Sequence, residues 1–191
     1  LESQKINGFY RDFKDMKNEN LSIVKKELPK LLILGYGRHG KDTVCEMLRE
    51  WYHFKFVSSS FFMAGKVIFP QLAPLYGYKT VDECYADRHN HRAEWFDIIA
   101  ETNKDDAASL GKALFKEYDI YCGCRNEREV QAMKDQKVYD LCIWVDRSSH
   151  QPPEDRSSCT VHHRMADLMI DNNGTLADLE DSVKELARAI L

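Results

Sequence analysis

Short apolar segments separated by helical patterns run along this chain and predict its fold class. Four consecutive apolar residues at 31–34 indicate a buried strand. Four further apolar segments predict strands, at 54–57, 120–122, 141–145 and 168–170. Helical spacing of apolar residues fills most of the intervals between them. Strands that alternate with helices favour a parallel sheet covered on both faces, so the pattern predicts an α/β protein, a three-layer α/β/α fold with a five-stranded parallel sheet.

The two ends of the chain are expected to be helical. Apolar residues within 1–28 recur at helical spacing between charges of both signs, which predicts an amphipathic helix that ends at Pro29. This helix could pack on its own domain, or it could form the contact of a homodimer. An apolar stripe at 176–190 predicts a last helix that closes the fold against the sheet. The chain is thus divided into an N-terminal helix at 1–29 and one domain at 30–191.

Three segments of the domain do not follow the alternation of strands and helices. The segment at 61–76 is apolar and aromatic, is interrupted by prolines, and could form the wall of a pocket because it follows a strand. Residues 80–117 are expected to be wholly helical, and Thr80 with Glu83 forms a capping-box pattern at their start. The polar, proline-containing segment at 146–160 is long for a loop in a compact domain, which is typical of a lid.

Composition limits the possible functions. The chain has 191 residues, which suits one domain with a small insertion, and its net charge of −4 argues against a broad basic surface for nucleic acid. No apolar run in the sequence reaches the ~20 residues that a membrane span needs. The six cysteines include no CxxC pair, so we expect buried free thiols in a reducing cytoplasm and no zinc site.

A glycine-rich turn joins the first strand to the helix that follows it. Its sequence, GYGRHGKDT at 35–43, matches the Gly-x4-Gly-Lys pattern of a phosphate-binding loop. The glycines permit positive φ, so the backbone amides could form an anion nest at the N-terminus of the helix. Lys41 adds a positive charge that can reach the β- and γ-phosphates of ATP. The expected ATP-binding residues are Gly35, Gly37, Arg38, His39, Gly40, Lys41, Asp42 and Thr43.

The residue after Lys41 departs from the general pattern. A serine or threonine is usual there, whereas this chain has Asp42 and places the hydroxyl one residue later, at Thr43. Asp42 could bind magnesium directly or through water, since magnesium prefers hard oxygen ligands. It could instead cap the first turn of the helix, where a negative charge is favoured. Both roles stay open, and Asp42 with Thr43 is the expected metal site.

Basic and aromatic residues in the helical segment could bind a second ligand. Arg88 and Arg92 are four residues apart and share a helix face close to Trp95. Two guanidinium groups there could hold a phosphate, while Trp95 or Phe61 stacks on a base. The alternative is a solvated face with local ion pairs, and for each aromatic residue an ordinary core position.

Three other arginines follow the predicted strands. Arg125 comes just after the third strand, where a parallel sheet delivers side chains into the ligand crevice. Arg147 follows the fourth strand, and Arg156 lies in the proline-containing loop. The last two could close over the triphosphate of a bound nucleotide and exclude water.

Four segments together resemble the P-loop kinases that phosphorylate nucleoside monophosphates, and most of all the phage-type deoxynucleoside monophosphate kinases. They are GYGRHGKDT (35–43), CRNEREVQAM (124–133), LCIWVDR (141–147) and MADLMIDNNGTLADLEDSV (165–183). The first and last are also seen in related kinases such as dephospho-coenzyme A kinase. The family usually has an acidic residue just before the arginine that follows the third strand, where this chain has Gly123 and Cys124.

The resemblance implies a P-loop kinase fold and magnesium-dependent phosphoryl transfer from ATP to a (deoxy)nucleoside monophosphate. It places the acceptor at 80–117 and the lid at 146–160. The implied catalytic residues are Lys41, Arg125, Arg147 and Arg156. The implied acceptor-binding residues are Phe61, Arg88, Arg92, Trp95 and Arg125. Two alternatives remain: a kinase for another small acceptor such as dephospho-coenzyme A, and a non-catalytic nucleotide-binding module.

Overall fold

The computed structural model describes residues 27–156 and 159–191. The amphipathic helix expected at the N-terminus therefore lies almost wholly outside the described residues. Its last expected positions, 27–29, are not helical.

All five strands of the central sheet are parallel, as the apolar pattern predicts. Their order across the sheet is β2-β3-β1-β4-β5. The strands are β1 (Leu31–Leu34), β2 (Phe56–Ser58), β3 (Ile120–Cys122), β4 (Leu141–Asp146) and β5 (Leu168–Asp171). The second strand begins later than expected, because α2 ends in a left-handed residue, His53, and the chain needs 54 and 55 to turn into the sheet. The prediction of a five-stranded parallel sheet is confirmed.

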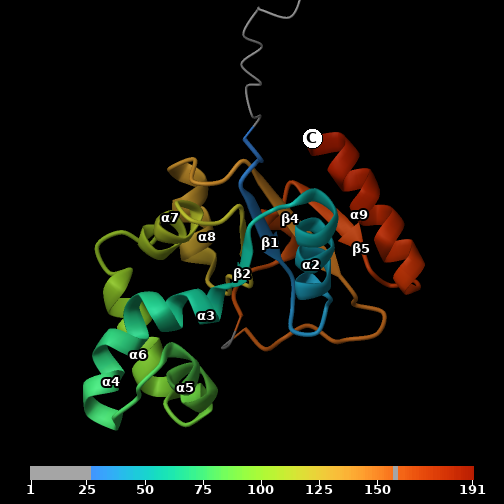
Figure 1. Ribbon diagram of the computed structural model, residues 1–191. Helices are drawn as coiled ribbons and strands as arrows, with labels where there is room; N and C mark the ends of the chain where they lie inside the picture. The colour runs from blue at the N-terminus through green and yellow to red at the C-terminus, as the bar shows by residue number, and fades with distance from the viewer. Residues whose placement is uncertain (1–26, 157–158) are drawn as a thin grey trace, which may run out of the picture.

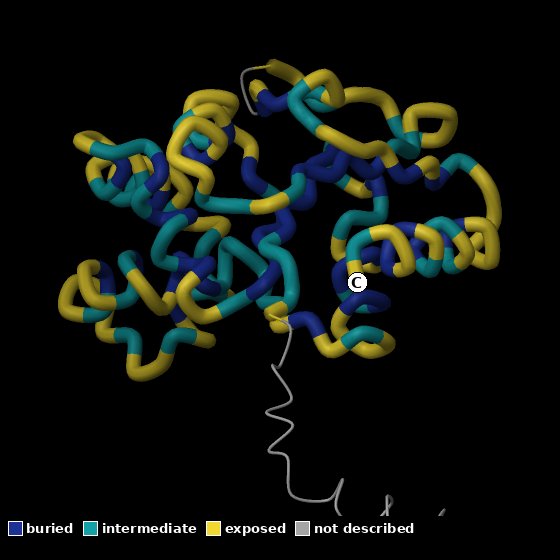
Figure 2. Tube along the Cα trace, turned by 90° about the horizontal axis from the view of Figure 1, so that it is seen from above, coloured by how far each residue is buried: buried dark blue, intermediate teal, exposed yellow. Residues whose placement is uncertain are grey.

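Helices cover both faces of the sheet, and alternate residues of β1 point into two separate cores. Leu31 and Ile33 belong to the core beneath one helix pair, while Leu32 and Leu34 belong to the core beneath the other. The first pair is α2 (Lys41–Tyr52) and α9 (Leu176–Ile190); the second is α7 (Ser109–Phe115) and α8 (Glu127–Asp135) (Figure 1). Figure 2 shows the buried positions concentrated between these layers.

A helical lobe extends from the carboxyl end of β2, at the lower left of Figure 1. It has its own core, in which Ala64, Ile68, Leu72, Cys84 and Trp95 are buried. The lobe consists of α3 (Ser59–Met63), a π-helical segment (Ala64–Ile68), α4 (Phe69–Tyr76), α5 (Val81–Ala86), a 3₁₀ turn (Asp87–His89) and α6 (Arg92–Thr102). Because it has a separate core, the lobe is an insertion beside the sheet rather than part of a covering layer.

The expectation that 80–117 is wholly helical is wrong. The helix is interrupted at 90–91 and again at 103–108. At the first break, Asp87 accepts hydrogen bonds from Asn90 and His91, and such local contacts compete with the helical pattern. At the second, Oδ1 of Asp106 accepts from the N–H of Ala108 at 3.0 Å, a local turn contact just before α7 begins at Ser109. The segment therefore divides between the lobe and the layer that covers the sheet.

Two further expectations can be compared with the structure. All six cysteines are buried and free, which confirms the expectation of buried free thiols. None of the helices within 27–156 and 159–191 is long and apolar enough to cross a membrane.

Asp119 holds the amino ends of three strands together, on the edge opposite the glycine-rich loop. Its Oδ1 accepts from Nζ of Lys30 at 2.7 Å, and its Oδ2 accepts from the N–H of Lys55 at 2.8 Å. Its backbone carbonyl accepts from the N–H of Leu31 at 2.8 Å. These contacts join the segments that precede β1, β2 and β3.

We expect Asp119→Ala to lower the free energy of unfolding by about 1–3 kcal/mol, because the partly buried N–H of Lys55 and the ammonium group of Lys30 lose their acceptor. Chemical denaturation measures this change. Asp181→Ala is the matched control: its exposed ion pair with Lys184 should contribute less than about 1 kcal/mol. Equal losses in the two variants would contradict the role given to Asp119.

Candidate active site

A cavity of about 730 Å³ lies at the carboxyl ends of β1 and β3. The sheet order places β3 and β4 on opposite sides of β1, so the chain crosses from one half of the sheet to the other after β3. Such a switch point is where open α/β sheets bind ligands. The glycine-rich loop, the segment after β2, the segment after β3 and α6 all contribute to its walls. Its volume is in the range of small-molecule sites.

The glycine-rich loop is closely packed against its neighbours. A Cβ on Gly35 would lie 2.6 Å from the carbonyl oxygen of Val145, and one on Gly40 would lie 2.4 Å from Nδ2 of Asn172. Both glycines also have positive φ, 146° and 90°. The loop thus needs glycine at both positions for packing and for conformation alike. Nζ of Lys41 lies over the loop and donates to the carbonyl of Tyr36 at 2.7 Å.

His39 and Arg147 support the loop from behind. His39 is fully buried and does not line the cavity. Its Nδ1 accepts from the N–H of Arg147 at 3.0 Å, which leaves Nε2 to donate to the carbonyl of Gln151 at 3.3 Å. The guanidinium of Arg147 donates to the carbonyl and Oδ1 of Asn172 at 2.9 and 3.2 Å. Asn172 in turn donates to the carbonyl of His39 at 3.0 Å. These side chains therefore join the loop to β4 and β5.

A carboxylate from the proline-containing loop reaches the front of the glycine-rich loop. Oε2 of Glu154 accepts from the N–H of Gly37 at 2.7 Å, and Oε1 accepts from Nη1 of Arg125 at 2.7 Å. Burial opposes ionisation, but these two hydrogen bonds hold the pKa of Glu154 below its usual value. An anionic group thus already contacts a loop amide and Arg125. Sequence reasoning did not find Glu154, because nothing in the sequence distinguishes it from other loop acids.

The expected magnesium ligands lie at the first turn of α2. Asp42 and Thr43 are both exposed. Asp42 does not cap the helix, since the N-cap position is Gly40 and has no side-chain hydrogen bond. One oxygen of Asp42 accepts a weak hydrogen bond from Sγ of Cys122 at 3.6 Å. In the described part of the chain no group of three His, Cys, Asp or Glu side chains could hold a metal. The donor set suits a cation that keeps several waters and shares phosphate ligands, as magnesium does.

The residues expected to bind the acceptor divide into two groups. Arg125 and Trp95 line the cavity, and Trp95 is only 8% exposed. Arg88 instead donates to the carbonyl of Tyr85 and lies over its ring, and Phe61 contacts the edge of the same ring. Neither lines the cavity.

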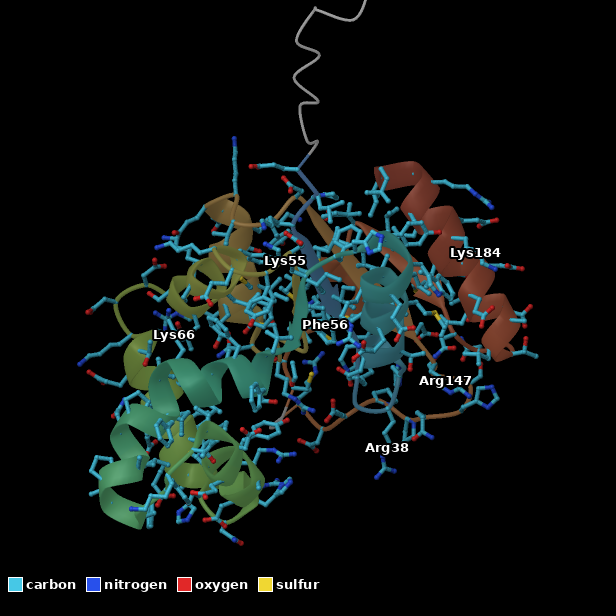
Figure 3. The ribbon with its side chains drawn as sticks, viewed as in Figure 1. Arg38, Lys55, Phe56, Lys66, Arg147 and Lys184 are labelled. Carbon is cyan, nitrogen blue, oxygen red and sulfur yellow. The ribbon has the colours of Figure 1, made fainter. Side chains whose placement is uncertain are left out.

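Three arginines lie at the periphery of the cavity. Arg92 is exposed and donates to Nδ1 of His89 at 3.1 Å. Arg156 is exposed and lies outside the cavity wall. Arg38 is at the rim of the cavity, and Figure 3 shows its side chain extending away from the loop.

Several cavity residues were missed from the sequence. They are Ser58, Ser59 and Ser60 after β2, Phe96 and Ile99 in α6, and Glu129 in α8. Met63 of α3 belongs to the segment at 61–76 that was expected to form a pocket wall, and it lines the cavity. The serines and the residues of α6 and α8 come from three separate parts of the chain, so no local pattern connects them.

A second depression, of about 690 Å³, lies beside α8. Its charged lining is mostly acidic: Asp105, Asp106, Glu127 and Asp135 accompany a single arginine, Arg128. This charge disfavours phosphate, so the cavity at β1 and β3 is the better candidate for nucleotide binding.

Comparison of the sequence with protein-family models and with curated proteins gives no match. The function is therefore inferred from the geometry of the cavity.

We expect Asn172→Ala to lower the free energy of unfolding by about 1–3 kcal/mol, because a buried carbonyl and the Arg147 guanidinium lose partners. Thermal and chemical denaturation measure it. Asn172→Asp separates the two contributions: aspartate still accepts from Arg147 but cannot donate to His39. An Asn172→Ala protein as stable as the wild type would show that this network does not hold the loop.

Proposed function

We propose that this protein is a magnesium-dependent kinase with a P-loop kinase fold that transfers the γ-phosphoryl group of ATP to a (deoxy)nucleoside monophosphate. The observation that supports it most is the arrangement of one continuous cavity. A glycine-rich loop with Lys41 lies at one side, Arg125 lies between, and the aromatic wall of the helical lobe lies at the other. Two phosphorylated ligands could meet at Arg125.

The glycine-rich loop is suited to the triphosphate. Its glycines leave the backbone amides close to the cavity, and the amide of Gly37 already binds a carboxylate. Lys41 can leave its contact with a carbonyl and take a phosphate oxygen, which is a stronger acceptor because it is charged. His39 and Arg147 would act indirectly, by holding the loop in position.

Arg125 is placed to bind the acceptor phosphate. Its Nη1 already donates to one oxygen of Glu154, and a phosphate would offer two oxygens to the guanidinium and more charge. The transfer breaks the bond between the γ-phosphorus and the β–γ bridging oxygen and forms one to an oxygen of the acceptor phosphate. That oxygen is already anionic at neutral pH, so no general base is needed. Positioning and charge neutralisation are then the main contributions of the protein.

Magnesium would be held by Asp42, directly or through water, with the hydroxyl of Thr43 near it, and would neutralise phosphate charge. Both side chains are exposed at the first turn of α2. In this proposal an acid on α2 takes the role of the acidic residue that the family usually has after the third strand.

The first experiment measures ATP consumption with magnesium across a panel of ribo- and deoxynucleoside monophosphates, with dephospho-coenzyme A included. Turnover on nucleoside monophosphates is the expected result. Turnover on dephospho-coenzyme A alone would favour the second kinase hypothesis. ATP binding without any turnover would favour a non-catalytic nucleotide-binding module.

We expect Lys41→Ala to abolish phosphoryl transfer while the melting temperature stays within a few degrees of the wild type. The ammonium group contacts one carbonyl and is not part of a core, so its removal costs little stability. Steady-state turnover measures the loss of activity, and thermal denaturation measures the melting temperature. Lys55→Ala is the control, because its side chain is exposed on the opposite edge of the sheet (Figure 3). An active Lys41→Ala enzyme would eliminate the P-loop mechanism.

Glu154 should oppose ATP binding in the free protein. Its carboxylate contacts a loop amide that the phosphates would need, and like charges repel. Glu154→Gln removes the charge and keeps the shape, so we expect ATP to bind about fivefold more tightly, roughly 1 kcal/mol. Calorimetric titration measures the affinity, with the exposed Glu50→Gln on α2 as the control. Weaker binding in Glu154→Gln would mean that the carboxylate helps to form the nucleotide site.

A further inference from the structure

The cavity contains a second carboxylate, far in chain position from the glycine-rich loop. Among the residues that line it, Asp42 and Glu129 are the two acids. Asp42 contacts Sγ of Cys122, whose side chain packs in the core beneath α2 and α9. Glu129 contacts Sγ of Cys124, whose side chain packs in the core beneath α7 and α8. The two acids therefore lie on opposite sides of the carboxyl end of β3.

Glu129 keeps most of its hydrogen-bonding capacity unused. Its side chain is half-buried and forms no ion pair with any residue of 27–156 or 159–191. The thiol of Cys124 donates weakly to Oε2 at 3.6 Å. Burial raises the pKa of Glu129, and the nearby side-chain amide of Asn103 partly opposes this rise. Nδ2 of Asn103 is buried and has no acceptor within hydrogen-bonding distance in the described chain. A ligand that donates to both carboxylate oxygens would favour the ionised form and complete this site.

The wall that belongs to α6 is aromatic and apolar. Trp95, Phe96 and Ile99 lie along it, and Met63 of α3 extends it. Trp95 also has a buried Nε1 with no partner among the described residues. A flat ring stacked on this wall could turn its edge towards the rest of the lining, to which β3 and α8 contribute. There Glu129 is the acidic group.

The nucleobases differ at that edge in the donors they offer. Guanine presents a ring N–H beside an exocyclic amine, so two neighbouring donors face one carboxylate. Adenine and cytosine each present one amine beside a ring-nitrogen acceptor, which the carboxylate repels. Uracil and thymine present one ring N–H between two carbonyl oxygens. A site built around hydrogen bonds to one edge rejects ligands that leave it unpaired.

We propose that Glu129 determines acceptor specificity and that the acceptor is a guanine nucleotide, whose ring N–H and exocyclic amine donate to the two carboxylate oxygens. This inference rests on the proposed kinase function, because it assigns the base of the acceptor in that same cavity. The phosphate of the nucleotide then extends towards Arg125, which precedes the helix that carries Glu129.

The test compares GMP, dGMP, IMP, AMP, CMP, UMP and dTMP as acceptors with magnesium-ATP. We expect the highest kcat/KM for GMP or dGMP. IMP lacks the exocyclic amine and should be about tenfold or more poorer, the effect of one hydrogen bond to a charged group. A wild-type preference for adenine or for a pyrimidine would overturn the proposal and leave the kinase function in place.

Glu129→Gln keeps the size of the side chain but presents one acceptor and one donor. It should lower kcat/KM for GMP by about 10- to 100-fold, leave the KM for ATP unchanged, and narrow the difference between GMP and AMP. Glu127→Gln is the matched control, since Glu127 is exposed on the same helix and does not line this cavity. Unchanged base discrimination in Glu129→Gln would exclude the role of this carboxylate.

Measurements of direct binding distinguish a failure of the proposed kinase function from a failure of the proposed guanine specificity. If no acceptor is phosphorylated, the kinase function fails, and calorimetric titration of GMP and AMP into the wild type still tests the base preference. Binding of GMP that weakens in Glu129→Gln would support the inference without catalysis. Equal or absent binding of GMP and AMP would overturn it. Glu129→Asp, which keeps the charge and shortens the side chain, replaces Glu129→Gln if thermal denaturation shows that the amide variant does not fold.

Discussion

The buried hydrogen bond from Asn172 to the carbonyl of His39 is the contact on which the glycine-rich loop depends. It joins the loop after β1 to the segment after β5, 133 residues later in the chain. The same asparagine accepts from Arg147 after β4, and the N–H of Arg147 donates to the His39 ring. The carboxyl ends of three adjacent strands are thereby held in one network. In front of the loop, Gly37 and Lys41 line the cavity, and the amide of Gly37 donates to Glu154.

The order of strands explains why the cavity lies where it does. Because β3 and β4 are on either side of β1, the helices that follow them diverge and leave a crevice at the end of β1. The helical lobe inserted after β2 closes the outer side with Trp95 and its neighbours. The inner side is formed by β3 and the start of α8, where charged and polar side chains concentrate. The cavity therefore has one apolar wall and one polar wall, and these indicate the type of ligand.

Site residues that lie close together in the sequence could be predicted from it. Site residues that come from distant segments could not. Lys41 begins the helix after β1 and Arg125 lies just after β3, and both line the cavity as expected. Arg88 and Arg92 were expected to face a ligand because of helical spacing, and Phe61 because its segment follows a strand. The break at 90–91 separates Arg88 from Arg92, and Arg88 and Phe61 both pack on Tyr85 instead. Local side-chain hydrogen bonds accompany that break, and a periodicity argument does not weigh them.

The sequence by itself determined the α/β class, the five parallel strands, the position of the glycine-rich loop and the burial of the cysteines. Each of these depends on hydrophobic period or on short-range backbone geometry, which neighbouring residues control. Only the tertiary structure decided that Arg147 and His39 support the loop, that Glu154 reaches its amide, and that Glu129 and Trp95 line the same cavity. Those contacts join segments from different strands and helices. Their formation depends on how the sheet orders its strands and on what each side chain meets there, which no local pattern records.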